Sequence, residues 1–233
     1  MMVTKYQKVM NDIKNDVISG IYAVGNQLPS EVELQEKYKV SRVTLRRAVD
    51  QLVKDGYVKK VQGKGTYVRN FKKIKRLIRH ASIESFSKIV IENEMTPKTK
   101  VLSIKECKFQ LDISNYNGLT EQAINVWRLR YADNVPVTIE NNYFPSPRFK
   151  KILEMDMSQS LYNLFYLQFG IKSLHTKKAT ISIVASSYEL AQLLDCSVGF
   201  PLFLLETIIT DDCGNVVQVA EEYIMSNRYQ FEL

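Results

Sequence analysis

Hydrophobic residues in the first twenty positions recur at the spacing of a helix. They fall every three or four positions, at Tyr6, Val9, Met10, Ile13 and Val17. This spacing puts them on one face of a helix of about four turns, which runs from Thr4 to Ser19 and ends at Gly20.

Two further helices are predicted by residues that suit helix starts. Ser30 and Glu33, three positions apart, have the pattern of a capping box, in which each side chain accepts a hydrogen bond from the other residue's backbone N–H. Ser41 can cap a third helix from Arg42 to Lys54, which Gly56 ends. The third helix is expected to bury Leu45, Ala48, Val49 and Leu52.

After the third helix the pattern changes to that of two short strands. Residues 57–61 and 66–68 flank Gln62-Gly63-Lys64-Gly65, a tight turn whose glycines allow positive φ. The resulting order of helix, helix, short turn, helix and hairpin is that of a winged helix-turn-helix domain. In such domains the third helix enters the major groove of DNA.

The exposed side of the third helix carries groups that suit this task. Arg42, Thr44, Arg46 and Arg47 lie at its N-terminal end and point outward. Arginine can bind guanine O6 and N7 with two hydrogen bonds, and serine or threonine can bond phosphates or bases. The alternative is a solvated helix face, but the neighbouring capped helices and the Gly-Lys-Gly turn favour DNA.

Charge divides the 233 residues into two unlike parts, which agrees with two domains of roughly 100–150 residues. Residues 1–80 carry a net charge of +11, whereas residues 81–233 carry −4. A basic module next to a mildly acidic one indicates that only the first meets a polyanion. Membrane-surface binding would need one amphipathic basic helix, and here the basic residues are spread over several elements.

The remaining chain alternates strands with short helices. Helical patterns cover residues 82–92, 160–169 and 187–194. Strand patterns cover residues 100–109, 123–131, 135–144, 179–185, 202–210 and 216–225. Several of these strands are joined by hairpin turns, which predicts an α+β domain built on an antiparallel sheet.

The first seventy residues resemble the DNA-binding domain of the GntR superfamily of bacterial transcription regulators. The resemblance rests on Leu28-Pro29-Ser30-Glu31, on residues 40–48 (VSRVTLRRA) and on residues 63–68 (GKGTYV). It implies DNA contacts from Ser41, Arg42, Thr44 and Arg46, with Gly63 at the wing tip and Lys64 as an additional phosphate contact. Family members often have Arg where this chain has Val32, so the operator sequence cannot be transferred from them.

Residues 80–233 are similar to the effector-binding (UTRA-like) domain of the HutC branch of that superfamily, a domain related in fold to chorismate lyase. The resemblance rests on residues 85–87 (SFS), 127–133 (WRLRYAD), 136–140 (PVTIE), 160–162 (SLY) and 228–231 (RYQF). It implies that this domain binds a small metabolite, often a sugar phosphate, and thereby changes how a dimer holds DNA.

Two arginines on one strand support an anion site independently of the resemblance. Arg128 and Arg130 are two positions apart and therefore project from the same face of the strand. A phosphate or carboxylate would satisfy both guanidinium groups, helped by hydroxyl and backbone donors near Ser85 and Ser87. In the alternative, the arginines pair with Glu140 and Glu222 in a structural network. The expected effector site comprises Ser85, Phe86, Ser87, Arg128, Arg130, Glu140, Ser160, Tyr162 and Glu222.

The predicted organisation is a winged helix-turn-helix over residues 1–70, a basic linker over 71–80 and an effector domain over 81–233. The linker either follows the DNA backbone or stays solvated. Three cysteines without metal-ligand spacing, and the lack of a long apolar stretch, indicate a cytoplasmic protein with no metal or cofactor and no membrane association.

The function expected from the sequence is that of a homodimeric, operator-binding transcription regulator. It is expected to be a repressor controlled by a small anionic metabolite, foremost a phosphorylated sugar. Two half-sites about one helical turn apart require a two-fold dimer. The alternatives are an enzyme of chorismate-lyase type and an architectural DNA-binding protein. The first lacks a recognisable reactive centre, and the second would leave the acidic domain without a role.

Overall fold

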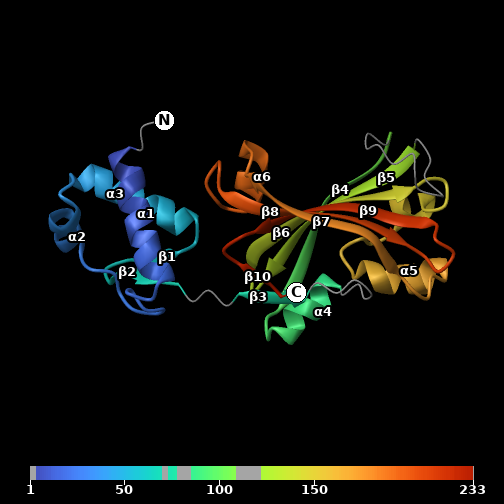
Figure 1. Cartoon of the computed structure of the whole chain (residues 1–233), viewed down its shortest axis with the longest axis horizontal. Helices are drawn as coiled ribbons and strands as arrows, with labels where there is room; N and C mark the ends of the chain where they lie inside the picture. The colour runs from blue at the N-terminus through green and yellow to red at the C-terminus, as the bar shows by residue number, and fades with distance from the viewer. Residues whose placement is uncertain (1–3, 70–72, 78–84, 109–121, 233) are drawn as a thin grey trace. The chain divides into compact units, whose positions relative to one another are not determined.

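The computed structural model describes residues 4–69, 73–77, 85–108 and 122–232. The chain divides into two compact units, drawn as a ribbon in Figure 1. The first comprises Met1–Lys72 together with Asp195–Phe200, and the second comprises Lys73–Leu194 together with Pro201–Leu233.

The first unit has the order predicted for a winged helix-turn-helix. Its elements are α1 (Lys5–Ile18), α2 (Glu31–Tyr38), α3 (Arg42–Lys54), β1 (Val58–Val61) and β2 (Gly65–Val68). The capping box at the start of α2 is confirmed, since Ser30 and Glu33 bond each other's backbone N–H groups. The Ser41 side chain caps α3 by accepting from Thr44 N at 3.3 Å. Leu45 and Leu52 of α3 are completely buried and form the centre of this unit's core.

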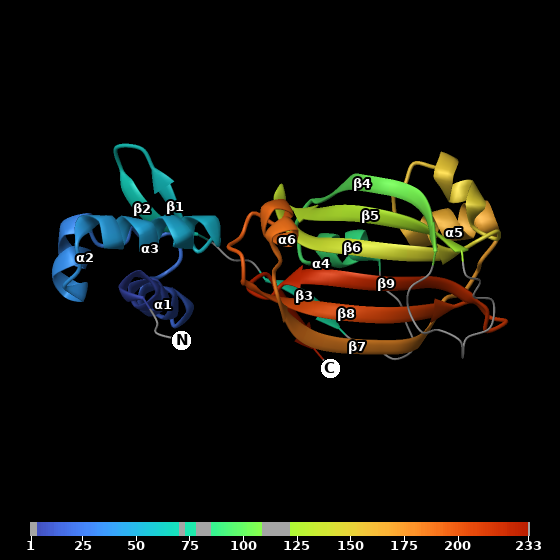
Figure 2. The ribbon, with the colours of Figure 1, turned by 90° about the horizontal axis from the view of Figure 1, so that it is seen from above.

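The second unit is an α+β structure built on one antiparallel sheet of six strands. Figure 2 shows the strands side by side in the order β4-β5-β6-β9-β8-β7. In chain order they are β4 (Pro97–Lys108), β5 (Gln122–Ala132), β6 (Val135–Pro145), β7 (His175–Ala185), β8 (Pro201–Thr210) and β9 (Val216–Met225). All six were predicted from alternating positions, and their bounds shift by up to four residues.

Three helices predicted by sequence are present, although shorter than expected. They are α4 (Phe86–Glu92), α5 (Leu161–Phe169) and α6 (Tyr188–Leu193), and a 3-10 helix, η1 (Lys150–Glu154), was not predicted. Residues 82–84 of the first predicted helix and Phe109 of the first predicted strand lie outside the described residues.

A second, smaller sheet lies where the sequence analysis placed only a linker. Strand β3 (Ile74–Leu77) pairs in parallel with β10 (Tyr229–Glu232) near the end of the chain. Neither strand was predicted, because each has only four residues and the pairing joins segments about 150 positions apart. Residues 74–77 are thus part of the second unit's structure, which differs from a wholly solvated or DNA-bound linker.

One face of the large sheet carries two apolar clusters with a polar strip between them. The first cluster packs α5 and η1 onto the sheet through Phe144, Ile152 and Phe165. The second packs α4 and the β3–β10 pair onto it through Ile74, Val90 and Tyr229. The polar strip follows from the sequence, because apolar residues on the inward positions of β5, β6 and β9 give way to charged and amide side chains at mid-strand. In the described part of the chain, no helix is long and apolar enough to span a membrane.

Candidate DNA-binding surface and effector pocket

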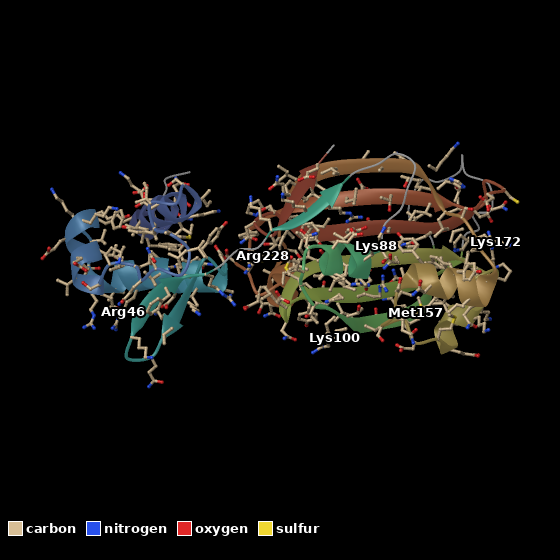
Figure 3. The ribbon with its side chains drawn as sticks, turned by 90° about the horizontal axis from the view of Figure 1, so that it is seen from below. Arg46, Lys88, Lys100, Met157, Lys172 and Arg228 are labelled. Carbon is tan, nitrogen blue, oxygen red and sulfur yellow. The ribbon has the colours of Figure 1, made fainter. Side chains whose placement is uncertain are left out.

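The first unit has a groove of about 740 Å³ between the start of α2, the outer side of α3 and the β1–β2 hairpin. Four of the predicted DNA-contact residues line it: Arg42, Arg46, Gly63 and Lys64. Ser41 and Thr44 stand at the N-terminus of α3, where the two hydroxyl groups lie 2.9 Å apart. Figure 3 shows Arg46 projecting from α3 on this side of the unit.

A single carboxylate links the two groove arginines. Arg42 Nε donates to Glu31 Oε2 at 3.0 Å, and Arg46 Nε donates to Glu31 Oε1 at 2.9 Å. The hydrogen bond from Arg46, together with that from Arg42 and both positive charges, lowers the pKa of Glu31 despite an opposing effect of burial. The Glu31 bonds use the Nε atoms of both arginines, and both side chains line the groove.

The hairpin tip is fixed by contacts that only glycine permits. Gln27 Nε2 donates to the carbonyl of Lys64 at 2.9 Å. Gly65 has φ +112°, and a Cβ there would lie 2.4 Å from the same Gln27 nitrogen, so a side chain at this position would displace the contact. The turn that presents Lys64 is therefore held in place by the body of the domain.

Arg47, the fourth residue predicted to point outward from α3, packs against α1. Its guanidinium lies 4.2 Å from the ring centroid of Tyr6. The cation–π contact stabilises the packing of two helices.

Glu31 was named from the sequence only as part of a motif. Its bonds to two arginines could not be predicted, because they depend on the packing of α2 against α3.

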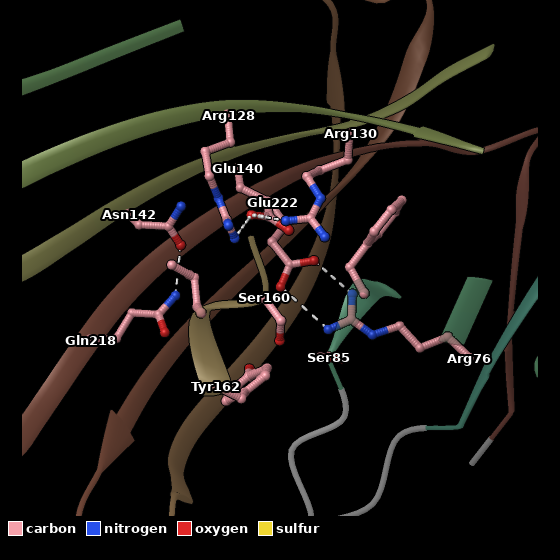
Figure 4. Close-up of a pocket in the computed structure, with 12 residues that line it drawn as sticks. Arg76, Ser85, Arg128, Arg130, Glu140, Asn142, Ser160, Tyr162, Gln218 and Glu222 are labelled. Carbon is pink, nitrogen blue, oxygen red and sulfur yellow. Dashed lines mark hydrogen bonds and ion pairs between the residues drawn. The ribbon is translucent and has the colours of Figure 1, made fainter. Parts of the chain in front are cut away.

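In the second unit, the polar strip of the sheet forms the floor of a pocket. Figure 4 shows the side chains that line it. They come from β5, β6 and β9, from the starts of α4 and α5, and from β3: Arg76, Ser85, Phe86, Arg128, Arg130, Glu140, Asn142, Ser160, Leu161, Tyr162, Gln218 and Glu222. The cavity left between them is about 30 Å³, enough for one or two water molecules.

Arg128 and Arg130 project from the same face of β5, as predicted, and both contact Glu140. Arg128 stands opposite Glu140 in the β5–β6 register and donates to its Oε2, while Arg130 Nη1 lies 3.6 Å from the same oxygen. Burial tends to raise the pKa of Glu140, but the two guanidiniums outweigh it and lower that pKa. Burial lowers the pKa of Arg130, and the nearby charge of Arg128 adds to this effect while Glu140 opposes it.

The pairing with Glu140 is the structural network that the sequence analysis weighed against an anion site. The network is incomplete, however. Among the described residues, the Nε atoms of Arg128 and Arg130 and the Oε1 atom of Gln218 are buried without a hydrogen-bond partner. Buried polar atoms of this kind are rare in folded proteins, and a ligand that bonds them is one explanation.

The serines and aromatic residues predicted for the site lie in two places. Phe86 and Ser87 contact Arg130, and Ser160 and Tyr162 lie at the start of α5. The Phe86 ring centroid lies 4.3 Å from the Arg130 guanidinium, and Arg130 Nη2 donates to Ser87 Oγ at 3.4 Å. Ser87 does not line the cavity, whereas Ser85 does and also caps α4 by accepting from Lys88 N at 3.2 Å. Ser160 begins α5 without a side-chain capping bond, which leaves its hydroxyl to the pocket.

A third arginine, which the sequence analysis did not place in the site, contacts Glu222. Arg76 Nη1 donates to Glu222 Oε2 at 2.6 Å, and Nη2 donates to Oε1 at 3.3 Å. Burial disfavours the charged guanidinium, but attraction to Glu222 and the two hydrogen bonds outweigh it and raise the pKa of Arg76. Burial, reinforced by the charge of Glu222, raises the pKa of Tyr162 as well.

Two amide side chains that the sequence analysis also missed complete the floor. Gln218 Nε2 donates to Asn142 Oδ1 at 2.6 Å. Both residues line the pocket from the same face as the two glutamates, Asn142 two positions after Glu140 and Gln218 four before Glu222. The even spacing of these amides from the two glutamates could have predicted that they share a face of the sheet, whereas no local pattern points to Arg76.

A winged helix-turn-helix with an arginine-lined groove, joined to an antiparallel sheet with a charged pocket, defines a two-domain DNA-binding regulator. Comparison with known proteins agrees. Residues 5–68 match the model of bacterial regulatory proteins of the gntR family, and residues 92–230 match the UTRA domain. The chain belongs to the GntR family of bacterial transcription regulators and carries a UTRA domain.

Individual relatives resemble the chain over nearly its whole length. A probable fructoselysine utilization operon transcriptional repressor of Escherichia coli O157:H7 is 32% identical over 96% of this chain and 91% of its own. The mannosyl-D-glycerate transport/metabolism system repressor MngR of Escherichia coli K12 is 25% identical over 98% and 94%. The crystal structure of PhnF from Mycobacterium smegmatis aligns with a TM-score of 0.63 at 20% identity, covering 96% of this chain and 97% of that one. The two Escherichia coli relatives are named as repressors, which favours regulation over the lyase alternative.

Proposed function

We propose that the protein is a cytoplasmic transcriptional repressor that binds operator DNA as a homodimer and leaves it when a small anionic sugar, foremost a phosphorylated one, occupies the pocket. The observation that carries this proposal is the composition of the pocket. Three arginines, two glutamates and two amides line one small cavity.

The pocket suits a ligand that is both anionic and rich in hydroxyl groups. Arginine guanidiniums bind phosphate or carboxylate oxygens in pairs of hydrogen bonds. Glu140 and Glu222 accept hydrogen bonds from hydroxyl or amino groups, and Asn142 and Gln218 can do both. Two relatives are named for fructoselysine and mannosyl-D-glycerate, which are sugar derivatives, and this supports a sugar-based ligand.

On the DNA side, the groove offers two kinds of contact. The guanidiniums of Arg42 and Arg46 are suited to guanine in the major groove, and Ser41 and Thr44 are suited to phosphate or base oxygens near the start of α3. Gly63 and Lys64 at the hairpin tip are suited to the minor groove and the backbone. One such unit covers too few base pairs for specific binding, so the proposal includes a two-fold dimer on two half-sites.

The test is a screen of phosphorylated sugars followed by a substitution. Thermal-shift measurements should identify a sugar phosphate that raises the melting temperature of the parent protein and releases it from operator DNA. Arg130→Ala should remove both responses, since this guanidinium is buried at the pocket floor. The matched control is Arg148→Ala, because Arg148 forms a surface ion pair with Asp211 outside the pocket.

Two outcomes would contradict the proposal. If no anionic sugar changes the melting temperature or the operator affinity, the ligand class is wrong. If the Arg130 variant still releases DNA at the concentration that releases the parent and the Arg148 control, the pocket is not the effector site. Sedimentation of the protein with and without operator measures the proposed dimer directly.

A further inference from the structure

Arg76 enters the pocket from the strand that follows the winged helix-turn-helix. Strand β3 begins six positions after β2 ends, so it is the first element of the second unit. Its backbone is held on both sides: Ile74 N donates to the Arg228 carbonyl at 2.8 Å, and Asn93 bonds both the N–H and the carbonyl of Lys75. The Arg76 guanidinium is thus carried by β3 and lines the pocket.

The Arg76–Glu222 ion pair is the more accessible part of the pocket's charged lining. The side chains of Arg76 and Glu222 are 18% and 16% exposed, whereas those of Arg128, Arg130 and Glu140 are 3%, 2% and 8% exposed. A sugar phosphate is many times larger than the one or two water molecules that the cavity admits. A ligand must therefore move part of the lining, and the pair in contact with solvent can move at the lowest cost.

We propose that Arg76 is an effector-binding residue, and that the anionic group of the effector takes the place of the Glu222 carboxylate as the partner of its guanidinium. This inference rests on the proposed function. A phosphate presents two oxygens to a guanidinium in the geometry that the Glu222 carboxylate uses now. Once displaced, Glu222 accepts hydrogen bonds from the hydroxyl or amino groups of the same ligand.

The exchange acts on β3, the strand that carries Arg76. A two-stranded sheet of four residues per strand has little stability of its own, so the position of β3 depends on its side-chain contacts with the large sheet. Ile74 supplies an apolar contact in the cluster with Val90, and Arg76 supplies the ionic contact with β9. A ligand that binds the Arg76 guanidinium differently in two arrangements of β3 shifts the balance between them.

The test uses inorganic phosphate as the probe and the full-length protein. Phosphate affinity is measured by calorimetry, and operator affinity is measured with and without phosphate at matched ionic strength, with chloride as the comparison salt. Arg76→Ala should lower phosphate affinity about tenfold, the range expected for one lost charge-assisted pair of hydrogen bonds, and should abolish the effect of phosphate on operator binding. The matched control is Lys75→Ala, which removes one positive charge from the adjacent, exposed position and should leave phosphate affinity unchanged.

Glu222→Gln is the second variant. Its readout is a gain in phosphate affinity, which a purely structural role of the Arg76–Glu222 pair would not produce. Replacing the competing carboxylate with an uncharged amide of the same size should increase phosphate affinity about threefold or more. If Arg76→Ala does not fold, as judged by circular dichroism, this gain decides the question alone. The absence of a gain would then overturn the proposal.

The outcomes separate this inference from the proposed function. If Arg130→Ala loses phosphate binding while Arg76→Ala binds it like the parent, the pocket is an anion site and Arg76 has no part in it. If the parent binds no phosphate at concentrations up to the millimolar range, the exchange at Arg76 is overturned, whereas the proposed function is decided by the screen of phosphorylated sugars. A loss in Arg76→Ala combined with a gain in Glu222→Gln supports the exchange at Arg76.

Discussion

The molecule contains the same chemical arrangement twice, once on its surface and once in its interior. In the DNA-binding unit, Glu31 bonds Arg42 and Arg46, whose side chains are 64% and 50% exposed. In the effector unit, Glu140 contacts Arg128 and Arg130, which are almost fully buried. In both places one carboxylate is shared by two guanidiniums, and the surroundings decide what the arrangement can do.

Exposure makes the first arrangement easy to rearrange. Surface ion pairs contribute about 0–1 kcal/mol, so phosphates or base edges can replace Glu31 as partners without a large loss of stability. Burial makes the second arrangement, the one around Glu140, costly to change. Taking one partner from a buried pair leaves an uncompensated charge and costs about 3–5 kcal/mol. The surface cluster therefore suits a long, variable polymer, and the buried cluster suits a small ligand whose shape is selected by fixed groups.

The largest expected effect is a difference in protein stability between substitutions of Glu140 and Glu31. Glu140→Ala should lower the free energy of unfolding of the effector domain by about 3–5 kcal/mol, because it leaves two buried guanidiniums without their carboxylate. Glu31→Ala should change it by less than about 1 kcal/mol. Urea denaturation followed by circular dichroism measures both. Equal losses in the two variants would show that burial does not distinguish the clusters.

Lowering the pH should reduce the stability that Glu140 contributes to the folded protein. The pKa of Glu140 is lowered in the folded protein, since Arg128 and Arg130 together outweigh the opposing effect of burial. Its stabilising effect is therefore fully present above the ordinary value of 4.5 and is lost as the pH falls through the lower, folded pKa. The stability difference between the parent and Glu140→Gln should shrink between pH 7 and pH 3. A difference that stays constant over this range would mean that folding does not lower the pKa of Glu140.

The third effect concerns operator affinity. Arg46→Ala should weaken operator binding by about 1–3 kcal/mol through the loss of a base or phosphate contact, while folding and effector binding stay intact. Gel-shift titration at fixed salt measures it. Arg47→Ala serves as the control on the same helix, because its guanidinium packs on Tyr6. An Arg46 variant with parental affinity would remove this residue from the interface.

Glu31→Gln should affect discrimination more than affinity. The change removes a negative charge from the groove, which favours binding to any DNA, and it also loosens the hold on the Nε atoms of Arg42 and Arg46. The ratio of operator to random-DNA affinity should therefore fall. In free energy, the loss of discrimination should be about 1–3 kcal/mol at most, which is the contribution of one base contact. Competition titrations with operator and random duplexes measure the ratio. If the ratio is unchanged, Glu31 does not position the arginines for recognition.

The two regions also differ in how much of them the sequence predicts. The DNA-binding unit is built from helices whose starts are marked by Ser30 and Ser41, and from a turn marked by Gly63 and Gly65, so its elements follow from local patterns. In the effector unit, the alternation along one strand placed Arg128 and Arg130 on one face. The partner of each charge, however, depends on strand register and long-range pairing. Local patterns therefore could not assign Arg76 to Glu222 or predict the β3–β10 sheet.

The smallest expected effect tests whether the hairpin contributes charge alone. Lys64 stands at an exposed turn whose backbone is fixed by Gln27, so its ammonium group can reach DNA without setting the position of any base-reading side chain. Lys64→Ala should therefore weaken binding to operator and random DNA by the same factor. It should also reduce the salt dependence of binding by about one phosphate per protomer. Operator affinity measured across a salt series gives this slope for the parent and the variant. A loss confined to one operator sequence, with an unchanged slope, would instead make Lys64 a base-reading residue and give the hairpin the role assigned here to α3.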